Sequence, residues 1–454
     1  MLNSLFNNKS KFIWFLFHLL LGILATYTNL FIMIWFYFIL FISLIKILRS
    51  KNIDYKNANI LNLLFYLLPF EIIARMTKTS PIIPYEMGKY LTSFIFILGI
   101  LINKNQKNSI GLIILVLLLP GILMGYLVET NIQYLIFNVL GMINIALGLI
   151  FIKGLRLANS SLIIENILTL SVLPILSSLI CAIIKTPKYD EFEFSFEANS
   201  IVSGGFGSNQ VSTAFGFAVF VLFYIWYKGK QFTGVSKFLD LLVMSLFLFQ
   251  GLLTFSRGGI IVGIIGVLMV LLSKGLKGRI VKTLFLGIPI IFLSLFIANS
   301  LTNGKLLLRY QGESEGTLIG SKVKNINHMT SGRFDILVGD LEIFMENPIL
   351  GVGVNQSRKI RNYSEGVVAH VEFSRLLAEH GLLGLIIFLI LLYFLYEKWH
   401  YLKGDNSILL ILFVIGLLTT FHAATRTFLS PLLIAFAYIR SKYILSINKV
   451  FNSA

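Results

Sequence analysis

The chain is a succession of long apolar stretches separated by short polar segments. A bilayer core about 30 Å thick needs roughly 20 apolar residues in one helix. About fourteen stretches approach that length, although several are short. They lie near residues 12–27, 28–47, 58–75, 90–103, 109–125, 131–152, 160–184, 210–227, 238–255, 259–273, 283–299, 381–397, 407–423 and 427–440. This pattern predicts an all-α fold, a polytopic bundle of transmembrane helices.

Very tight turns join two pairs of these stretches. One turn lies between residues 27 and 28, and the other is the segment Ser256-Arg257-Gly258-Gly259. A re-entrant or broken helix at such a turn would reduce the number of complete spans, so we expect about 12 to 14. Since no internal repeat or flexible linker divides the chain, residues 1–454 are expected to form a single integral membrane domain.

Two longer polar segments, at about 186–209 and 300–380, interrupt the apolar pattern. Loops of this length are usually functional or disordered. In the second segment, SGRFDILVGDLEIFMENP predicts an amphipathic helix that Ser331 caps and Asn347-Pro348 ends, with Phe334, Leu337, Leu341 and Phe344 on its apolar face. A polar helix is then expected to continue from AHVEFSRLLAEHGLLG directly into the next span.

The charged residues between the stretches indicate the orientation of the chain. With the N-terminus in the cytoplasm, every inner loop is basic, whereas GYLVETN and YDEFEFSFE on the other side contain no Lys or Arg. The positive-inside rule therefore places both termini in the cytoplasm and the two long loops outside. Lys78 and Lys89 are exceptions on the outer side, and such exceptions are candidates for binding an anion.

Composition agrees with a membrane protein. The chain is 56% hydrophobic and 13% charged, with a mean hydropathy of +0.84 and a formal charge of +17. The basic inner loops account for most of this charge, so it does not indicate binding of nucleic acid. Cys181 is the only cysteine, which excludes an intramolecular disulfide and a cysteine metal cluster. We expect no bound metal and no cofactor.

Two arginines of the outer segments are candidates for binding phosphate. Arg257 lies at the turn between two apolar helices, and Arg333 lies at the start of the amphipathic helix, where unpaired main-chain N–H groups also favour anions. A guanidinium presents a planar set of donors that matches phosphate. The alternatives are an interfacial anchor for Arg257 and an ordinary surface charge for Arg333.

His370 is the candidate general base, because it lies between the long loop and a helix that enters the membrane. His380 and His422 compete for this role, and Arg426 beside His422 is a further cationic candidate. The i,i+4 spacing of Arg375 and Glu379 predicts a structural salt bridge.

Arg75 has the same spacing from Glu71, but this pair lies at the end of a span, where ionisable groups are costly and often functional. Arg75 is therefore a candidate for binding the substrate together with Lys89.

Four segments, in this order, resemble one known family. TFSRGG, SGRFDI with ENPILGVGVN, and a histidine shortly before GLLG resemble the superfamily of O-antigen ligases, O-antigen polymerases and O-linked oligosaccharyltransferases. GGFGSNQVSTAFG resembles a segment of polymerase-like members, which usually have proline where Ser208 stands here. The resemblance covers about residues 200–395.

The resemblance implies a metal-independent, inverting glycosyltransferase in the bacterial inner membrane, with its active site on the periplasmic face. The implied donor is an undecaprenyl-diphosphate-linked glycan, and the acceptor is a glycan or a lipid. Carried over by position, Arg257 and Arg333 bind the diphosphate, Asn209 and Gln210 belong to the substrate site, and His370 activates the acceptor hydroxyl. Membrane lipids and a chain-length regulator protein are the other expected partners.

The segment GGFGSNQVS and Val371 after the histidine, where ligases usually have Asn or Ser, favour a polymerase of O-antigen or exopolysaccharide repeat units. The alternatives are a ligase that attaches the glycan to lipid A-core and a transferase to protein. A transporter or flippase is the alternative from another class, but such proteins need ionisable groups in the middle of spans, and these are scarce here.

Overall fold

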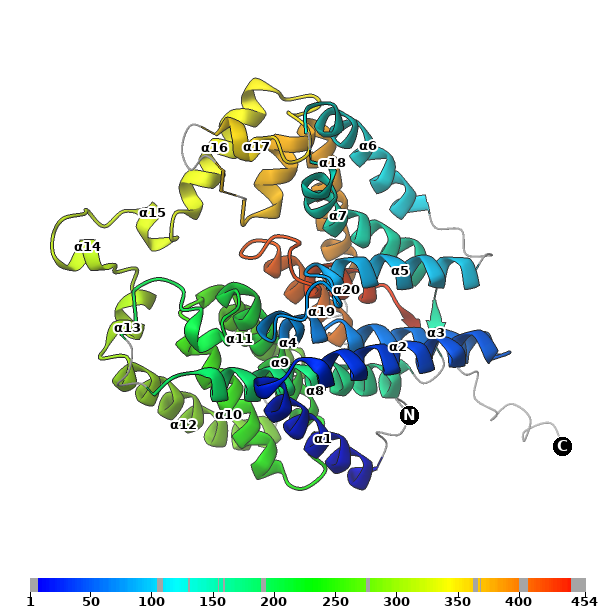
Figure 1. The fold of residues 1–454 in the computed structure, drawn as a ribbon, viewed down its shortest axis with the longest axis vertical. Helices are drawn as coiled ribbons and strands as arrows, with labels where there is room; N and C mark the ends of the chain where they lie inside the picture. The colour runs from blue at the N-terminus through cyan, green and yellow to red at the C-terminus, as the bar shows by residue number, and fades with distance from the viewer. Residues whose placement is uncertain are drawn as a thin grey trace.

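A computed structural model shows a bundle of α-helices (Figure 1). The structure describes residues 7–103, 109–129, 131–153, 155–157, 160–188, 193–274, 278–361, 366–367, 369–399 and 407–441. The helices are α1 (Asn8–Tyr27), α2 (Leu30–Arg49), α3 (Ile53–Leu67), α4 (Phe70–Met76), α5 (Met87–Ile102), α6 (Ser109–Val128), α7 (Ile132–Ile152), α8 (Ser160–Lys185), the 3-10 helix η1 (Ile201–Ser203), α9 (Ser208–Tyr227), α10 (Lys237–Leu253), α11 (Arg257–Lys274), α12 (Gly278–Leu301), α13 (Lys305–Tyr310), α14 (Glu315–Leu318), α15 (Ile326–Met329), α16 (Arg333–Glu346), α17 (Ser357–Ile360), α18 (Glu372–Trp399), α19 (Ser407–Thr419) and α20 (Leu429–Phe436).

The prediction of an all-α polytopic bundle is confirmed. Eight helices in the described part of the chain are long and apolar enough to cross a membrane, and four shorter helices are also apolar. In the last predicted stretch, 427–440, the helix α20 is only eight residues long. Two-residue strands, β1 (Arg156–Leu157) and β2 (Arg440–Ser441), pair in parallel.

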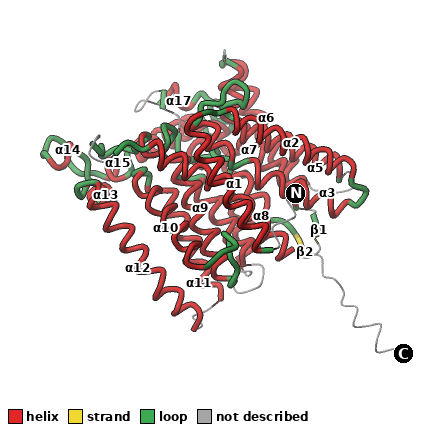
Figure 2. The backbone as a smooth tube through the Cα atoms, turned by 60° about the horizontal axis from the view of Figure 1, so that its bottom comes forward, coloured by secondary structure: helices red, strands yellow, loops and turns green. Residues whose placement is uncertain are grey.

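The short helices of the second long segment gather at one end of the bundle. Figure 2 shows α13, α14, α15 and α17 at this end, whereas β1 and β2 lie toward the other end. The first long segment, between α8 and α9, contains η1. Because α9 and α11 both begin at the end that carries these segments, residues far apart in the sequence meet there.

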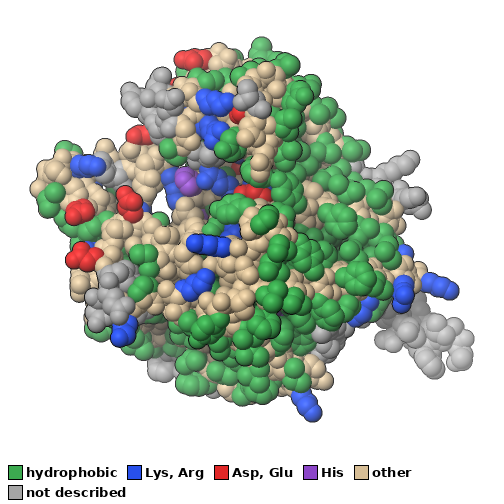
Figure 3. All heavy atoms as spheres, viewed as in Figure 1, with side chains coloured by type: hydrophobic (Ala, Val, Ile, Leu, Met, Phe, Trp, Pro, Cys, Tyr) green, Lys and Arg blue, Asp and Glu red, His purple; other side chains and the backbone are tan. Residues whose placement is uncertain are grey.

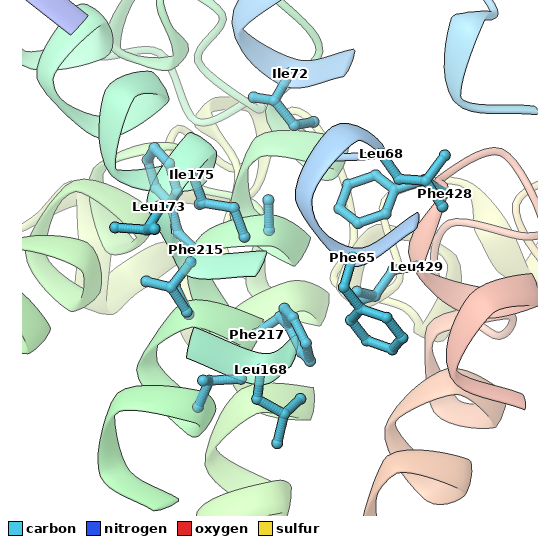
Figure 4. Close-up of a cluster of buried hydrophobic side chains, with 14 of the residues drawn as sticks. Phe65, Leu68, Ile72, Leu168, Leu173, Ile175, Phe215, Phe217, Phe428 and Leu429 are labelled. Carbon is cyan, nitrogen blue, oxygen red and sulfur yellow. The ribbon is translucent and has the colours of Figure 1, made fainter. Parts of the chain in front are cut away.

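The interior is packed with large apolar side chains that exclude water from the helix contacts. Figure 4 shows Phe65 and Leu68 on α3 and its C-terminal end, Leu168 on α8, Phe215 on α9 and Phe428 directly before α20 in one cluster. Each of these side chains is buried. This cluster holds the N-terminal and C-terminal parts of the chain together beneath the long segments.

Glycine lets α9 and α11 approach closely. A Cβ at Gly259 would lie 2.3 Å from the main-chain nitrogen of Thr213, and one at Gly216 would lie 2.1 Å from the carbonyl oxygen of Gly259. Small residues at helix contacts allow backbones to touch in this way. The close contact places Arg257, at the start of α11, beside the start of α9.

The amphipathic helix forms where expected, and the structure corrects its start. α16 begins at Arg333, after Ser331 and Gly332 with φ values of 55° and 79°, and Ser331 makes no capping hydrogen bond. The Ser331 hydroxyl instead accepts hydrogen bonds from two arginines, which makes it unavailable as a cap. Asn347 ends the helix as predicted.

The most buried side of α16 differs from the predicted apolar face. Ile336, Gly339, Asp340 and Ile343 are its fully buried residues. Asp340 is buried because its carboxylate lies 3.1 Å from Nε of Arg361 and accepts a hydrogen bond of 2.8 Å from the Ser374 hydroxyl. The pattern of apolar residues cannot predict that a helix face is buried through an ion pair.

The helix that enters the membrane after His370 is broken rather than continuous. Gly381 has φ 61° and ψ −138° inside α18, and the N–H of Leu382 donates to the carbonyl oxygen of Pro348 over 2.7 Å. A Cβ at Gly381 would lie 2.5 Å from that same oxygen. The expected uninterrupted helix is therefore wrong, because the segment after α16 occupies the space that a regular turn would need.

We expect cysteines at the two ends of the bundle to differ in their reaction with a membrane-impermeant maleimide. Val323→Cys, at an 84% exposed position between α14 and α15, should be labelled in intact cells, and Lys228→Cys, after α9, should be labelled only after lysis. Cys181 is buried and provides the unreactive background. Labelling of Lys228→Cys in sealed cells would reverse the orientation predicted from loop charge.

Candidate active site

Two adjoining chambers lie at the end of the bundle where α9 and α11 begin. The larger chamber has a volume of about 900 Å³ and is lined by residues that include Arg257, Arg309 and Arg333. The smaller chamber, of about 360 Å³, is lined by residues that include Gln210 and Arg426. Ala198, Asn209 and His370 line both chambers. Figure 3 shows a hollow on this face, in which a histidine lies beside several Lys or Arg side chains.

Arg257 is oriented by the loop that covers the larger chamber. Its Nη1 donates to the carbonyl oxygen of Arg309 over 3.0 Å, and its Nη2 donates to the carbonyl oxygen of Met329 over 2.5 Å. Nη2 also lies 3.4 Å from the hydroxyl oxygen of Ser331. These contacts span residues 309–331, so Arg257 links the start of α11 to the covering loop.

Arg309 belongs to the same cluster, although sequence reasoning did not select it. Its Nη2 donates to Ser331 Oγ over 2.8 Å, so one hydroxyl holds both Arg309 and Arg257. Burial and the neighbouring charges of Arg257 and Arg333 lower the pKa of Arg309 to about 10. Arg309 therefore stays charged at neutral pH, although the neighbouring arginines disfavour its positive charge.

Arg333 reaches the chamber from the start of α16, as predicted. Its Nη2 lies 3.4 Å from Oδ1 of Asn209, which also accepts a hydrogen bond of 2.6 Å from the Ser256 hydroxyl. Asn209 thus connects the first turn of α9 with the turn before α11 and with α16. The structure brings Asn209, Arg257, Arg333 and His370 together, four of the residues predicted for the site.

Positive charge is in excess in the larger chamber. Among the described residues, none of Arg257, Arg309 and Arg333 has a carboxylate within salt-bridge distance. Glu197 and Glu315 line the wall without forming such a pair. Like charges that converge without counter-ions are stabilised when an anion binds between them, so this chamber is suited to an anion.

His370 lies where the two chambers meet. Burial, followed by the charges of Arg426 and Arg333, lowers the pKa of His370 to about 3, so its imidazole is neutral at pH 7. In the described part of the chain, Nδ1 has no hydrogen-bond partner. A neutral imidazole has one ring nitrogen that can accept a proton, so His370 has the chemistry of a base at the place where the two chambers meet.

The two competing histidines lie elsewhere. His422 lines neither chamber, and its Nε2 lies 3.0 Å from Thr213 Oγ1. A Cβ at Gly258 would lie 2.5 Å from the His422 ring, so this histidine packs into the contact between α11 and the turn after α19. His380 is buried beside Gly121 of α6. Among the histidines whose side chains the structure describes, His370 is the one that lines the two chambers.

A network at the start of α18 fixes the segment that carries His370. The Glu372 carboxylate accepts hydrogen bonds from the main-chain N–H and the hydroxyl of Thr425, over 2.9 and 3.0 Å. Its other oxygen forms an ion pair with Arg375. The predicted pair of Arg375 with Glu379 is therefore corrected, since Glu379 accepts instead from the N–H of Asn355 over 2.9 Å.

Arg426 and Gln210 line the smaller chamber, in agreement with their selection as candidates. Arg426 Nη2 donates to the carbonyl oxygen of Ala369 over 2.7 Å, directly before His370. Gln210 Oε1 accepts a hydrogen bond of 3.2 Å from Arg75 Nη1. Arg75 therefore contacts the wall of this chamber from behind.

Arg75 and Lys89 are engaged by protein groups. Arg75 forms an ion pair with Glu71 and donates to the carbonyl oxygen of Tyr85 over 2.7 Å. Lys89 Nζ lies 3.1 Å from a carboxylate oxygen of Glu86 and 2.9 Å from the carbonyl oxygen of Phe137. Neither residue lines the two chambers. Carboxylates compensate the positive charges of Arg75 and Lys89, in contrast to the arginines of the larger chamber.

One sequence signal would have identified Arg309. It is a basic residue in a segment assigned to the outer side, which is the same exception to the positive-inside rule that selected Lys89. Ser256 and Ser331, which orient Asn209 and the arginines, have no comparable signal, because serine is common in turns.

Comparison with known proteins gives a family match for part of the chain. Residues 241–389, about one third of the chain, match a family model described as O-antigen ligase. No curated protein and no solved structure gives a significant match. The matched segment includes Arg257, Arg309, Arg333 and His370 and ends before Arg426. The predicted relation to the O-antigen ligase and polymerase superfamily is thereby confirmed.

Proposed function

We propose, from the premise that residues 241–389 carry an O-antigen ligase family domain, that this protein transfers a glycan from undecaprenyl diphosphate to an acceptor hydroxyl. The observation that carries the proposal is the convergence of three guanidinium groups, none with a carboxylate partner among the described residues, and a neutral histidine on two adjoining chambers. The reaction takes place on the periplasmic face of the bacterial inner membrane.

The larger chamber holds the diphosphate of the donor. Arg257, Arg309 and Arg333 replace the contacts that phosphate oxygens make with water, and a guanidinium can bind two oxygens at once. Negative charge develops on the diphosphate as its bond to the sugar breaks. Fixed cations lower the energy of that transition state without a metal ion.

His370 acts as the base toward an acceptor in the smaller chamber. The acceptor hydroxyl gives its proton to the imidazole while its oxygen forms a bond with the anomeric carbon of the donor sugar. The bond between that carbon and the diphosphate oxygen breaks, and its electron pair leaves with undecaprenyl diphosphate. Attack from the side opposite the diphosphate inverts the anomeric configuration.

We further propose that the acceptor is a second repeat unit, which makes the reaction a polymerisation. The sequence GGFGSNQVSTAFG, which resembles polymerases, supplies Asn209 and Gln210 to the smaller chamber. Val371 follows His370 where ligases usually have Asn or Ser. Transfer to lipid A-core or to protein would use the same donor chamber and differ only in the acceptor.

The purified protein should convert an undecaprenyl-diphosphate-linked repeat unit, supplied alone with EDTA, into a ladder of longer glycans. Gel electrophoresis of the released glycans measures this product directly. If product forms only after lipid A-core is added, the protein is a ligase. If no covalent product forms while lipid-linked glycan crosses proteoliposomes, the transporter alternative holds and the transferase proposal fails.

The acidic limb of the pH profile should move when the donor binds. In the free protein the pKa of His370 is about 3, so kcat/KM should not fall between pH 7 and 5 through protonation of this residue. A bound diphosphate places negative charge beside Arg333, which raises the pKa of His370 and should shift the limb of kcat to higher pH. A kcat/KM limb near pH 6.5 that disappears in His370→Gln would contradict this assignment.

A further inference from the structure

A third cavity lies near the end of the bundle remote from the two chambers. It has a volume of about 430 Å³, within the range of ligand pockets, and is lined by residues of α1, α8 and the segment after α9. Its polar lining includes Lys11, Glu165, Asn166, Thr169, Lys230 and Gln231. α9 separates Asn209 from Lys230, and a helix of 20 residues is about 30 Å long. The third cavity is therefore distinct from the proposed active site.

Among the described residues, two cations and one anion line the cavity. Lys230 forms an ion pair with Glu165, which leaves the charge of Lys11 uncompensated. Lys11 Nζ donates to the carbonyl oxygen of Gln231 over 2.6 Å, and no described carboxylate lies within salt-bridge distance of it. An ammonium has three N–H donors, so Lys11 retains donors for an added anion.

The surroundings are those of a membrane interface. Trp226 and Tyr227 end α9 and are followed by Lys228 and Lys230. Aromatic residues next to lysines are enriched where a span meets the lipid headgroups. Leu162, which borders the cavity, is 48% exposed and offers an apolar surface beside the charged one.

We propose that this cavity binds the phosphate headgroup of an anionic phospholipid, with Lys11 and Lys230 as its cationic contacts. Basic pockets between transmembrane helices are suited to such headgroups. A free phosphate ion would satisfy the same charge, but the exposed Leu162 beside the cavity favours a ligand with an acyl chain.

Native mass spectrometry of the full-length protein tests the proposal. The protein in detergent should retain phosphatidylglycerol in preference to phosphatidylethanolamine, and Lys11→Gln should weaken this retention about tenfold, since a hydrogen bond to a charged group is lost. Lys11→Gln leaves the ion pair of Lys230 with Glu165 intact, so the fold is expected to persist. Lys11→Arg should keep retention near that of the wild type.

Lys228→Gln is the matched control, because it removes the same charge from an exposed position just outside the cavity. Retention should change less than twofold. Equal losses in Lys11→Gln and Lys228→Gln would show diffuse attraction by the basic surface and would overturn the cavity as the site. Protection of the wild type from thermal unfolding by inorganic phosphate, without any effect of phosphatidylglycerol, would overturn the lipid assignment.

Discussion

Replacement of His370 by glutamine is expected to lower the rate of glycan transfer by about a hundred- to ten-thousand-fold, the usual contribution of a general base. Glutamine can still form a hydrogen bond with an acceptor hydroxyl, but it cannot take up the proton. The measurement is kcat with a lipid-linked repeat unit, together with the amount and length of polymer in cells that lack their own transferase. Expression and membrane insertion should remain normal.

His422→Gln is the control for this experiment. His422 is a buried histidine near the same end of the bundle, but it packs against Gly258 and lines neither chamber. Its replacement should retain most of the transfer activity. Near-normal polymer in His370→Gln, combined with loss in His422→Gln, would assign the base to His422.

The second large effect is expected for Arg257→Lys, although this change keeps the positive charge. Loss of one donor to the developing charge of a transition state typically costs about a hundred- to a thousand-fold in rate. An ammonium cannot reproduce the planar pair of contacts that a guanidinium makes with phosphate. We expect kcat/KM for the lipid-linked donor to fall by about a hundredfold or more.

Two control variants separate phosphate binding from the position of the covering loop. Ser331→Ala removes the hydroxyl that holds Arg257 and Arg309 but leaves both cations, so it should retain most activity. Arg358→Lys changes an arginine on α17 that lies 5.0 Å from the Tyr134 ring and outside both chambers. If Arg257→Lys behaves like Arg358→Lys, Arg257 is an interfacial anchor.

The arrangement of the helices along the chain was readable in the sequence. Apolar windows mark the helices, because a bilayer leaves no water to satisfy an unpaired backbone. The end of α16 at Asn347 was also predicted, since Pro348 cannot continue a helix. The four segments that resemble the O-antigen ligase superfamily selected Arg257, Arg333 and His370, and a family match covers these three residues.

Other features depended on groups that are distant in the sequence. The break at Gly381 requires the carbonyl oxygen of Pro348, and the ion pair of Asp340 with Arg361 joins α16 to the end of α17. Arg375 pairs with Glu372 rather than with Glu379, whose Oε1 accepts a hydrogen bond from the N–H of Asn355. Helical spacing predicts which residues are close enough to pair with a charged residue, but it does not predict which of them forms the ion pair.

The sequence by itself determined the membrane class, the helices and most of the residues of the candidate site. These properties follow from local composition, because the bilayer acts on each stretch of chain separately. Only the tertiary structure decided which cations share a chamber. It placed Arg309 beside Arg257 and paired Lys89 with Glu86, although both are basic residues predicted on the outer side. The physical reason is that a cation is available to an anionic ligand where the fold places no carboxylate beside it, and that depends on contacts between distant segments.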